Sequence, residues 1–172
     1  MFVLVRAVTY AALFIGLLLV LLPAQLLSPS GLVPPEVIGA AQITGMVIAI
    51  GGGALALWCI ASFAVVGRGT PAPFDPPRRL VVRGPYAVVR NPMYIGAGLA
   101  LAGASLFYQS LVLLGYAAAF FLATHLFVVL YEEPTLGRTF GTDYEAYCRQ
   151  VRRWWPRMSK RGGPGRGTAV GA

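Results

Sequence analysis

The strongest constraint on this chain is a series of long apolar segments. A segment of about 20 apolar residues is long enough to cross a bilayer as a helix. Of the 172 residues, 57% are hydrophobic, and the mean hydropathy is +0.69. These values are too apolar for a soluble domain of this size. The sequence therefore predicts an all-α polytopic membrane helix bundle with about four transmembrane helices, at residues 3–22, 38–66, 92–107 and 111–131.

The lengths of these segments add detail. Residues 3–22 could be a cleaved signal peptide, but we expect a retained helix, because a small bundle needs the span for packing. Segment 38–66 is over-long and must tilt, or bend at its three consecutive glycines. Only residues 108–110 separate the last two segments, which predicts a tight antiparallel hairpin. Small residues recur at a four-residue spacing and predict close helix packing within the chain, at Gly45, Ala49 and Gly53.

The distribution of the basic residues predicts the orientation of the bundle. None of the 14 Lys and Arg residues lies in segments 23–37 or 108–110. The positive-inside rule then places both termini and the loop between the second and third spans in the cytosol. The net charge of +8 is accordingly interpreted as topology rather than as nucleic-acid binding. We expect a multi-pass integral membrane protein, in the plasma membrane, or in the inner membrane of a bacterium.

One domain is expected over residues 1–157, followed by a disordered, basic, Gly-rich tail at 158–172. Cys59 and Cys148 have no Cys or His neighbours at metal-ligand spacing, so neither a disulfide framework nor a metal site is predicted. His125 is the single histidine. Within a span, we interpret it as a hydrogen-bonded packing residue rather than as a ligand.

Polar motifs gather at the predicted cytosolic surface. Asn91 is a good helix N-cap and Pro92 a good first residue, so the third span is expected to begin here. Its free amides, its dipole and the neighbouring Arg90 make this helix start a candidate site for a carboxylate or phosphate. The alternative is a plain helix start with an anchor for lipid phosphate. Glycines follow at Gly96 and Gly98, where a helix or a ligand needs close approach.

Two adjacent carboxylates, Glu132 and Glu133, are expected at the C-terminal end of the fourth span. They oppose the helix dipole there and repel each other, so stability alone does not explain them unless arginines offset them. The hairpin predicts that they lie beside the start of the third span, although about 40 positions separate the two in sequence.

A short cytosolic helix is predicted over residues 143–152. Thr142 and Glu145 have the spacing of a capping box. Tyr144 and Tyr147 fall on one face, together with Cys148. The segment is either a membrane-surface helix or a lid over the neighbouring polar site.

Four motifs together resemble the group of isoprenylcysteine carboxyl methyltransferases and phospholipid methyltransferases. The resemblance runs from about residue 83 to residue 157. The matching positions are Arg90, Pro92, Tyr94 and Gly96; Glu132 and Glu133; Phe140, Gly141, Tyr144 and Tyr147; and Arg153, Trp154 and Pro156. One position departs from the group, because Asn91 stands where the group often has histidine. A role that needs an imidazole is therefore not carried over to Asn91.

The resemblance implies an enzyme that holds S-adenosyl-L-methionine at the cytosolic end of the last helices and releases S-adenosyl-L-homocysteine. Expected cofactor contacts are Tyr94, Gly96, Gly98, Glu132 and Glu133, with Asn91 and Pro92 at the helix start and Tyr144 and Tyr147 in the cover. Expected catalytic residues are Arg90, Glu133 and Arg153.

The acceptor is expected to be amphiphilic, since the motifs lie at the interface. The carboxylate of an isoprenylcysteine-like molecule is favoured and would need a cation, Arg90 or Arg153. A phosphatidylethanolamine amine is the alternative and must lose a proton to a carboxylate or tyrosinate. A non-enzymatic transporter or scaffold is the third possibility, but the spans carry no Asp or Glu for coupling. Membrane lipids are expected partners; nucleic acid and an obligatory protein partner are not.

Overall fold

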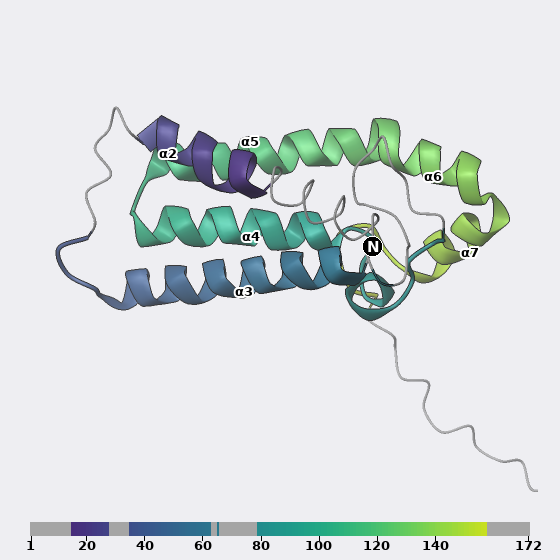
Figure 1. Ribbon diagram of the computed structural model, residues 1–172, viewed down its shortest axis with the longest axis horizontal. Coiled ribbons are helices and arrows are strands. Elements are labelled where there is room, and N and C mark those ends of the chain that lie inside the picture. The colour runs from purple at the N-terminus through teal and green to yellow at the C-terminus, as the bar shows by residue number, and fades with distance from the viewer. Residues whose placement is uncertain (1–14, 28–34, 63–64, 66–78, 158–172) are drawn as a thin grey trace, which may run out of the picture.

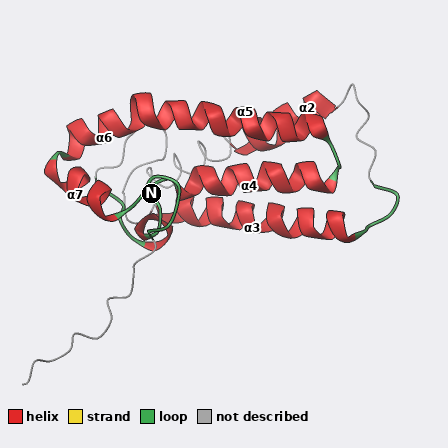
Figure 2. Ribbon diagram, turned by 180° about the vertical axis from the view of Figure 1, so that it is seen from behind, coloured by secondary structure: helices red, strands yellow, loops and turns green. Residues whose placement is uncertain are grey.

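The computed structural model describes residues 15–27, 35–62, 65 and 79–157; the rest of the chain is outside its description. Every regular element among the described residues is helical, as Figure 2 shows, which confirms the all-α class. The elements are η1 (Ile15–Leu21), α2 (Leu22–Leu27), α3 (Ala40–Ser62), η4 (Gly84–Ala87), α4 (Pro92–Phe107), α5 (Leu111–Phe127), η5 (Val128–Glu132), α6 (Glu133–Phe140) and α7 (Thr142–Gln150). Of the short elements, η1 and η5 are π-helical and η4 is a 3₁₀-helix.

Three long helical rods run side by side, with α4 between α3 and α5 in Figure 1. Two of them are long and apolar enough to cross a membrane: α3, whose most apolar 18-residue window has a mean hydropathy of 2.0, and the continuous helix Leu111–Phe140, whose most apolar window has 2.1. Only 22% and 28% of their most apolar windows are buried, so the flanks expose apolar side chains, as lipid-facing helices do. The shorter α4 is also apolar. The count of four spans and the cytosolic termini stay predictions.

The predicted boundaries hold best for the hairpin. The third segment, 92–107, is α4, and the fourth begins at Leu111 as expected. Between them, Gln109 adopts a positive φ of 52°, and the Ser110 side chain caps α5 by accepting a hydrogen bond from the Leu113 amide at 3.3 Å. The tight antiparallel connection is therefore confirmed.

Other boundaries differ from the expectation. The start of the first segment lies outside the described residues, but its predicted end at residue 22 is wrong, since α2 continues to Leu27. Pro23, which was expected to close the segment, lies inside this helical run, because α2 follows η1 without a break. The second segment begins at Ala40 rather than at residue 38, and α3 runs through its three glycines without interruption. The predicted end at residue 66 lies outside the described part.

The seam between α3 and α4 is a contact of backbone on backbone. A Cβ atom built on Gly45 would lie 2.7 Å from the carbonyl oxygen of Gly103, and one built on Gly96 would lie 2.7 Å from that of Gly52. Real Cβ atoms do not approach other atoms so closely. Small residues are therefore required at both levels of the seam.

The predicted packing face is confirmed at Gly45 and Ala49, but it is wrong at Gly53, where an added Cβ would meet nothing within 4 Å. The buried position is Gly52. A strict four-residue repeat drifts around a helix of 3.6 residues per turn, so the contact face returns after seven residues rather than after eight.

Substitution of Gly103 by Ala should destabilise the seam, because the added methyl group would lie 2.6 Å from the Gly45 carbonyl oxygen. We expect a loss of about 1–3 kcal/mol, the usual cost of overpacking. Thermal unfolding in detergent measures it. The matched control is Gly115→Ala on α5, where an added Cβ meets nothing within 4 Å. Equal melting temperatures for the two variants would contradict the close seam.

Candidate functional site

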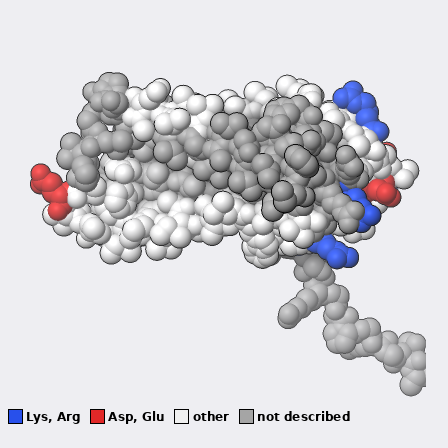
Figure 3. All heavy atoms as spheres, viewed as in Figure 1, with Lys and Arg blue, Asp and Glu red and all other residues white. Residues whose placement is uncertain are grey.

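Charged side chains gather at the end of the bundle where α6 and α7 lie (Figure 3). Arginines and carboxylates are seen together there, while the described residues along the length of the bundle in this view are uncharged. An acidic group lies at the other end, where the chain leads into α3. Among the described residues, the charges at the α6–α7 end are eight arginines and four carboxylates: Arg79, Arg83, Arg90, Arg138, Arg149, Arg152, Arg153, Arg157, Glu132, Glu133, Asp143 and Glu145.

The centre of this end is Glu133, which two arginines contact. Arg153 forms a two-pronged contact, with Nε 2.8 Å from Oε1 and Nη2 2.6 Å from Oε2. Arg90 Nη1 lies 3.1 Å from Oε1. The side chains of Glu133 and Arg90 are only 18% and 14% exposed, so solvent screens this pair weakly. The hydrogen bonds to Glu133 raise the pKa of the Arg153 guanidinium above its usual range.

The glutamates lie inside a longer helix rather than at its end. The helix that begins at Leu111 continues through η5 and α6 to Phe140, so the expected position of Glu132 and Glu133 at a helix C-terminus is wrong. The expected opposition to the helix dipole does not arise, and arginines offset the charge of Glu133 directly. The prediction that these glutamates lie beside the start of α4 is confirmed by the Arg90–Glu133 pair.

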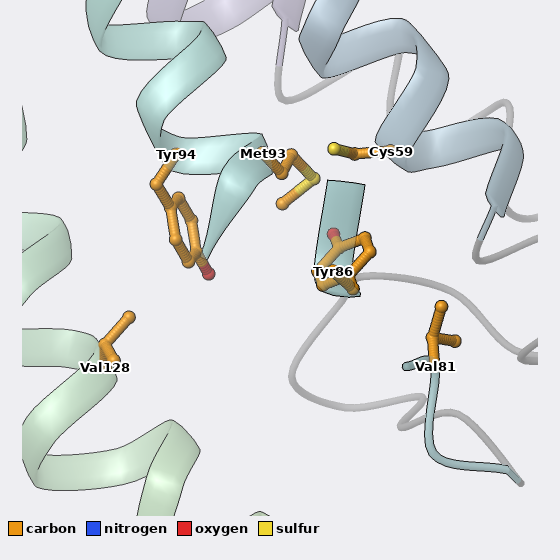
Figure 4. Close-up of a cluster of buried hydrophobic side chains, with 6 residues drawn as sticks. All are labelled: Cys59, Val81, Tyr86, Met93, Tyr94 and Val128. Carbon is orange, nitrogen blue, oxygen red and sulfur yellow. The ribbon is translucent and has the colours of Figure 1, made fainter. Parts of the chain in front are cut away.

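Glu132 has a different partner from its neighbour. The Tyr94 hydroxyl donates to Glu132 Oε2 at 3.1 Å, from the first turn of α4. Tyr94 is 8% exposed and belongs to a buried cluster that joins α3, η4, α4 and η5. Figure 4 shows its ring on the α4 side of that cluster, with Val128 of η5 below it and Tyr86 of η4 opposite. Within the described part of the chain, no arginine or lysine lies at ion-pair distance from Glu132.

Helix α4 starts where the sequence predicted it, but its start lacks the predicted side-chain cap. Pro92 is the first residue of the helix, and Asn91 occupies the N-cap position without a side-chain capping hydrogen bond. Asn91 Nδ2 instead donates to the Arg153 carbonyl oxygen at 3.4 Å, and the Arg90 amide donates to the Arg152 carbonyl oxygen at 2.9 Å. The capping role expected of Asn91 is therefore wrong, because its side chain holds the chain that follows α7.

Helix α7 runs from Thr142 to Gln150, slightly displaced from the predicted 143–152. The predicted capping box is wrong, since Gly141 is the N-cap and no side chain caps the helix. Gly141 has φ of 50° and ψ of −124°, a conformation open to glycine almost alone. This sharp turn directs α7 back from α6.

The predicted apolar face of α7 is confirmed. Tyr144 and Tyr147 are buried, and the Tyr147 hydroxyl donates to the Tyr86 carbonyl oxygen at 2.7 Å. Burial raises the pKa of both tyrosines well above the usual range, so each hydroxyl keeps its proton at neutral pH. Beside them, Cys148 Sγ accepts a hydrogen bond from Arg90 Nη1 at 2.7 Å.

The two glycines proposed as cofactor contacts differ in their surroundings. Gly96 is buried against the α3 backbone, and that contact by itself accounts for a glycine there. Gly98 has open space where a side chain would be. A cofactor role for either glycine stays a prediction.

Two contacts at this end of the bundle were not predicted from the sequence. One is the contact of Cys148 with Arg90, although the helical face of Cys148 was predicted. The other is the hydrogen bond from Trp154 Nε1 to His125 Nδ1 at 3.1 Å. Interpreting His125 as a hydrogen-bonded packing residue is thereby confirmed, but its partner lies 29 positions away and carried no signal in the sequence.

An apolar helical bundle with one charged end is typical of helical membrane proteins that have a site at the interface. Residues 40–143, more than half of the chain, match the phospholipid methyltransferase family, and the chain belongs to that family. No curated protein and no solved structure matched the chain. The expected resemblance to membrane methyltransferases is confirmed, and the family's chemistry implies S-adenosyl-L-methionine as the methyl donor.

Substitution of Glu133 by Gln should loosen the segment from α7 onward, because two arginines would lose their shared counter-charge. We expect a cost of about 1–3 kcal/mol, below that of a fully buried pair because Arg153 is partly exposed. Hydrogen–deuterium exchange over residues 142–157 should become faster. The control is Glu145→Gln, whose pair with Arg149 is exposed and 3.9 Å apart. Identical exchange in both variants would show that Glu133 does not hold this segment.

Proposed function

We propose that this protein transfers a methyl group from S-adenosyl-L-methionine to an amphiphilic lipid acceptor at the charged end of the bundle. The observation that supports this most is the pairing at adjacent positions: Glu133 with two arginines, and Glu132 with the Tyr94 hydroxyl. Glu133 thus lies in a region of surplus positive charge, whereas Glu132 has no cation among its described neighbours.

These groups fit the chemistry of the donor. Its amino-acid carboxylate needs a cation, and the two arginines carry one charge more than Glu133 neutralises. Its ammonium or ribose hydroxyls need a carboxylate, and Glu132 is available nearby. Its sulfonium is favoured by aromatic faces, and the rings of Tyr94 and Tyr144 lie at this end of the bundle. When bound, S-adenosyl-L-methionine supplies an activated methyl group for direct displacement.

The chain's own contribution would be alignment and exclusion of water. Displacement needs the two reacting atoms in line and close together, which a fixed site provides. Tyr94, 8% exposed, orients Glu132 through its hydroxyl group, and Tyr144 and Tyr147 of α7 are also buried. Exclusion of water from the site would strengthen its electrostatic contacts. Arg90 and Arg153 hold the covering segment through Glu133.

We favour the amine of a phosphatidylethanolamine-type phospholipid as acceptor. The family's description supports it. An amine must lose a proton before it attacks a methyl group, and a carboxylate at this end of the bundle can accept that proton. The carboxylate of an isoprenylcysteine-like molecule is the second candidate. Arg153 supports it, because its side chain is 31% exposed and could contact such an anion.

We further propose that residues 1–157 form one domain with four spans, both termini cytosolic and the site on the cytosolic face. The concentration of charge at one end supports a single aqueous face for the site. A lipid acceptor would then reach this end from the bilayer and the donor from the cytosol.

Calorimetry with S-adenosyl-L-homocysteine tests the donor site. Wild-type protein should bind it, and Glu132→Gln should weaken binding about tenfold, the value of a hydrogen bond to a charged group. Glu145→Gln should bind as wild type does. If folded wild-type protein fails to bind where another family member binds, the enzyme proposal is wrong and a transporter or scaffold takes its place. Unchanged affinity in both Glu132→Gln and Glu133→Gln would mean that the site lies elsewhere.

A labelled-donor assay separates the acceptors. We expect label in phosphatidylethanolamine presented in vesicles, and that label should stay non-volatile after alkaline hydrolysis because an N-methyl group survives it. Label on a prenylcysteine analogue would be released by alkali as methanol, since the product is a methyl ester, and would favour the second candidate. Methylation of water-soluble acceptors alone would contradict a lipid acceptor.

A further inference from the structure

Three consecutive residues after α7 contact three different parts of the helical body. The Arg152 carbonyl oxygen accepts a hydrogen bond from the backbone at the start of α4. The Arg153 guanidinium binds Glu133, where η5 meets α6. Trp154 Nε1 donates to His125 Nδ1 on α5 at 3.1 Å. The first two contacts belong to the site described above. The third lies beside it and has no role in the proposed reaction.

Trp154 contacts α5 through the packing of its ring as well as through its hydrogen bond. Its ring centroid lies 5.0 Å from that of Phe121 and 5.9 Å from that of His125. The indole N–H and the imidazole nitrogen each need a partner in these apolar surroundings, and each satisfies the other. Removal of either group therefore leaves an unpaired polar atom on the other.

The π-helical element η5 explains how consecutive residues can reach both His125 and Glu133. Two turns of a regular α-helix take about 7 residues. In a π-turn, the backbone hydrogen bond joins residues that are five positions apart rather than four, so the turn contains one more residue. The eight-residue separation of His125 from Glu133, with η5 between them, thus completes about two turns. Both side chains return to one face, and the chain after α7 lies along it.

We propose that His125 and Trp154 are positioning residues. Their contact keeps the Arg153 side chain at Glu133 and so shapes the methyl-transfer site. Neither is a catalytic residue, because they act through the neighbouring arginine. With Trp154 fixed on α5, the backbone of Arg153 has few conformations left. The long arginine side chain then loses less freedom when it binds Glu133, which is the general advantage of preorganisation. The functional half of this inference rests on the proposed function.

The test begins with Trp154→Phe, which keeps one aromatic ring and removes the indole N–H together with the second ring of the indole. Amide exchange at Arg90 should become roughly three- to tenfold faster, because its acceptor, the Arg152 carbonyl oxygen, would be held less firmly. The affinity for S-adenosyl-L-homocysteine should fall by a similar factor. The matched control is Trp155→Phe, next in sequence and 75% exposed, which should leave both values unchanged.

Substitutions at His125 separate positioning from general damage. His125→Leu removes the acceptor and should reproduce the effects of Trp154→Phe. His125→Asn restores a short side-chain acceptor and should recover most of the affinity. The double variant His125→Leu with Trp154→Phe should be no worse than either single variant, because one contact is lost in all three. Additive losses, or no rescue by Asn, would overturn the positioning role.

Arg90 exchange distinguishes failure of this inference from failure of the proposed function. If Trp154→Phe changes neither exchange nor affinity in wild-type-like protein, the positioning role is overturned while the enzyme proposal stands. If exchange at Arg90 responds as expected but wild-type protein binds no S-adenosyl-L-homocysteine, the methyl-transfer role is overturned, and the hold of Trp154 on Arg153 is supported.

Discussion

Glu133 and its two arginines are the contact on which the charged end of this molecule depends. Arg90 comes from the start of α4, Glu133 from the helix that begins at Leu111, and Arg153 from the chain after α7. Three segments far apart in sequence are thus joined through one carboxylate. Partly buried charges are costly to desolvate, and a single pair would return little. Arg153 binds Glu133 through two hydrogen bonds and Arg90 adds a third contact, so the positions of all three side chains are fixed. A binding site needs such fixed positions.

The apolar body is held together differently. In lipid, apolar side chains gain nothing by leaving an apolar solvent, so helices associate through close contact of their surfaces. The α3–α4 seam uses glycines at both ends for this purpose, Gly52 and Gly96 at one level and Gly45 and Gly103 at the other. The start of α4 carries Tyr94 and Arg90, so the rigid seam also fixes where the polar groups stand.

The sequence predicted those features that depend on long or local patterns. Apolar runs located the helices, and the three-residue loop required the hairpin that brings Arg90 to Glu133. Predictions failed where a distant partner overrides a local preference. The Asn91 side chain binds the Arg153 carbonyl oxygen instead of capping α4. The helix with both glutamates continues to Phe140, and two arginines from other segments pair with Glu133. The pairing of Trp154 with His125 required the full fold.

The glycine seam also limits the routes by which a lipid could approach. An acceptor whose tail lies in the bilayer must bring its head group to the charged end along the flank of some helix. Between α3 and α4, the backbones at Gly52 and Gly96 leave no space for even one methyl group. A hydrocarbon tail cannot part the two helices there without breaking the body of the protein. Lateral access is therefore confined to the other flanks of the bundle, and the seam gives the molecule a closed side.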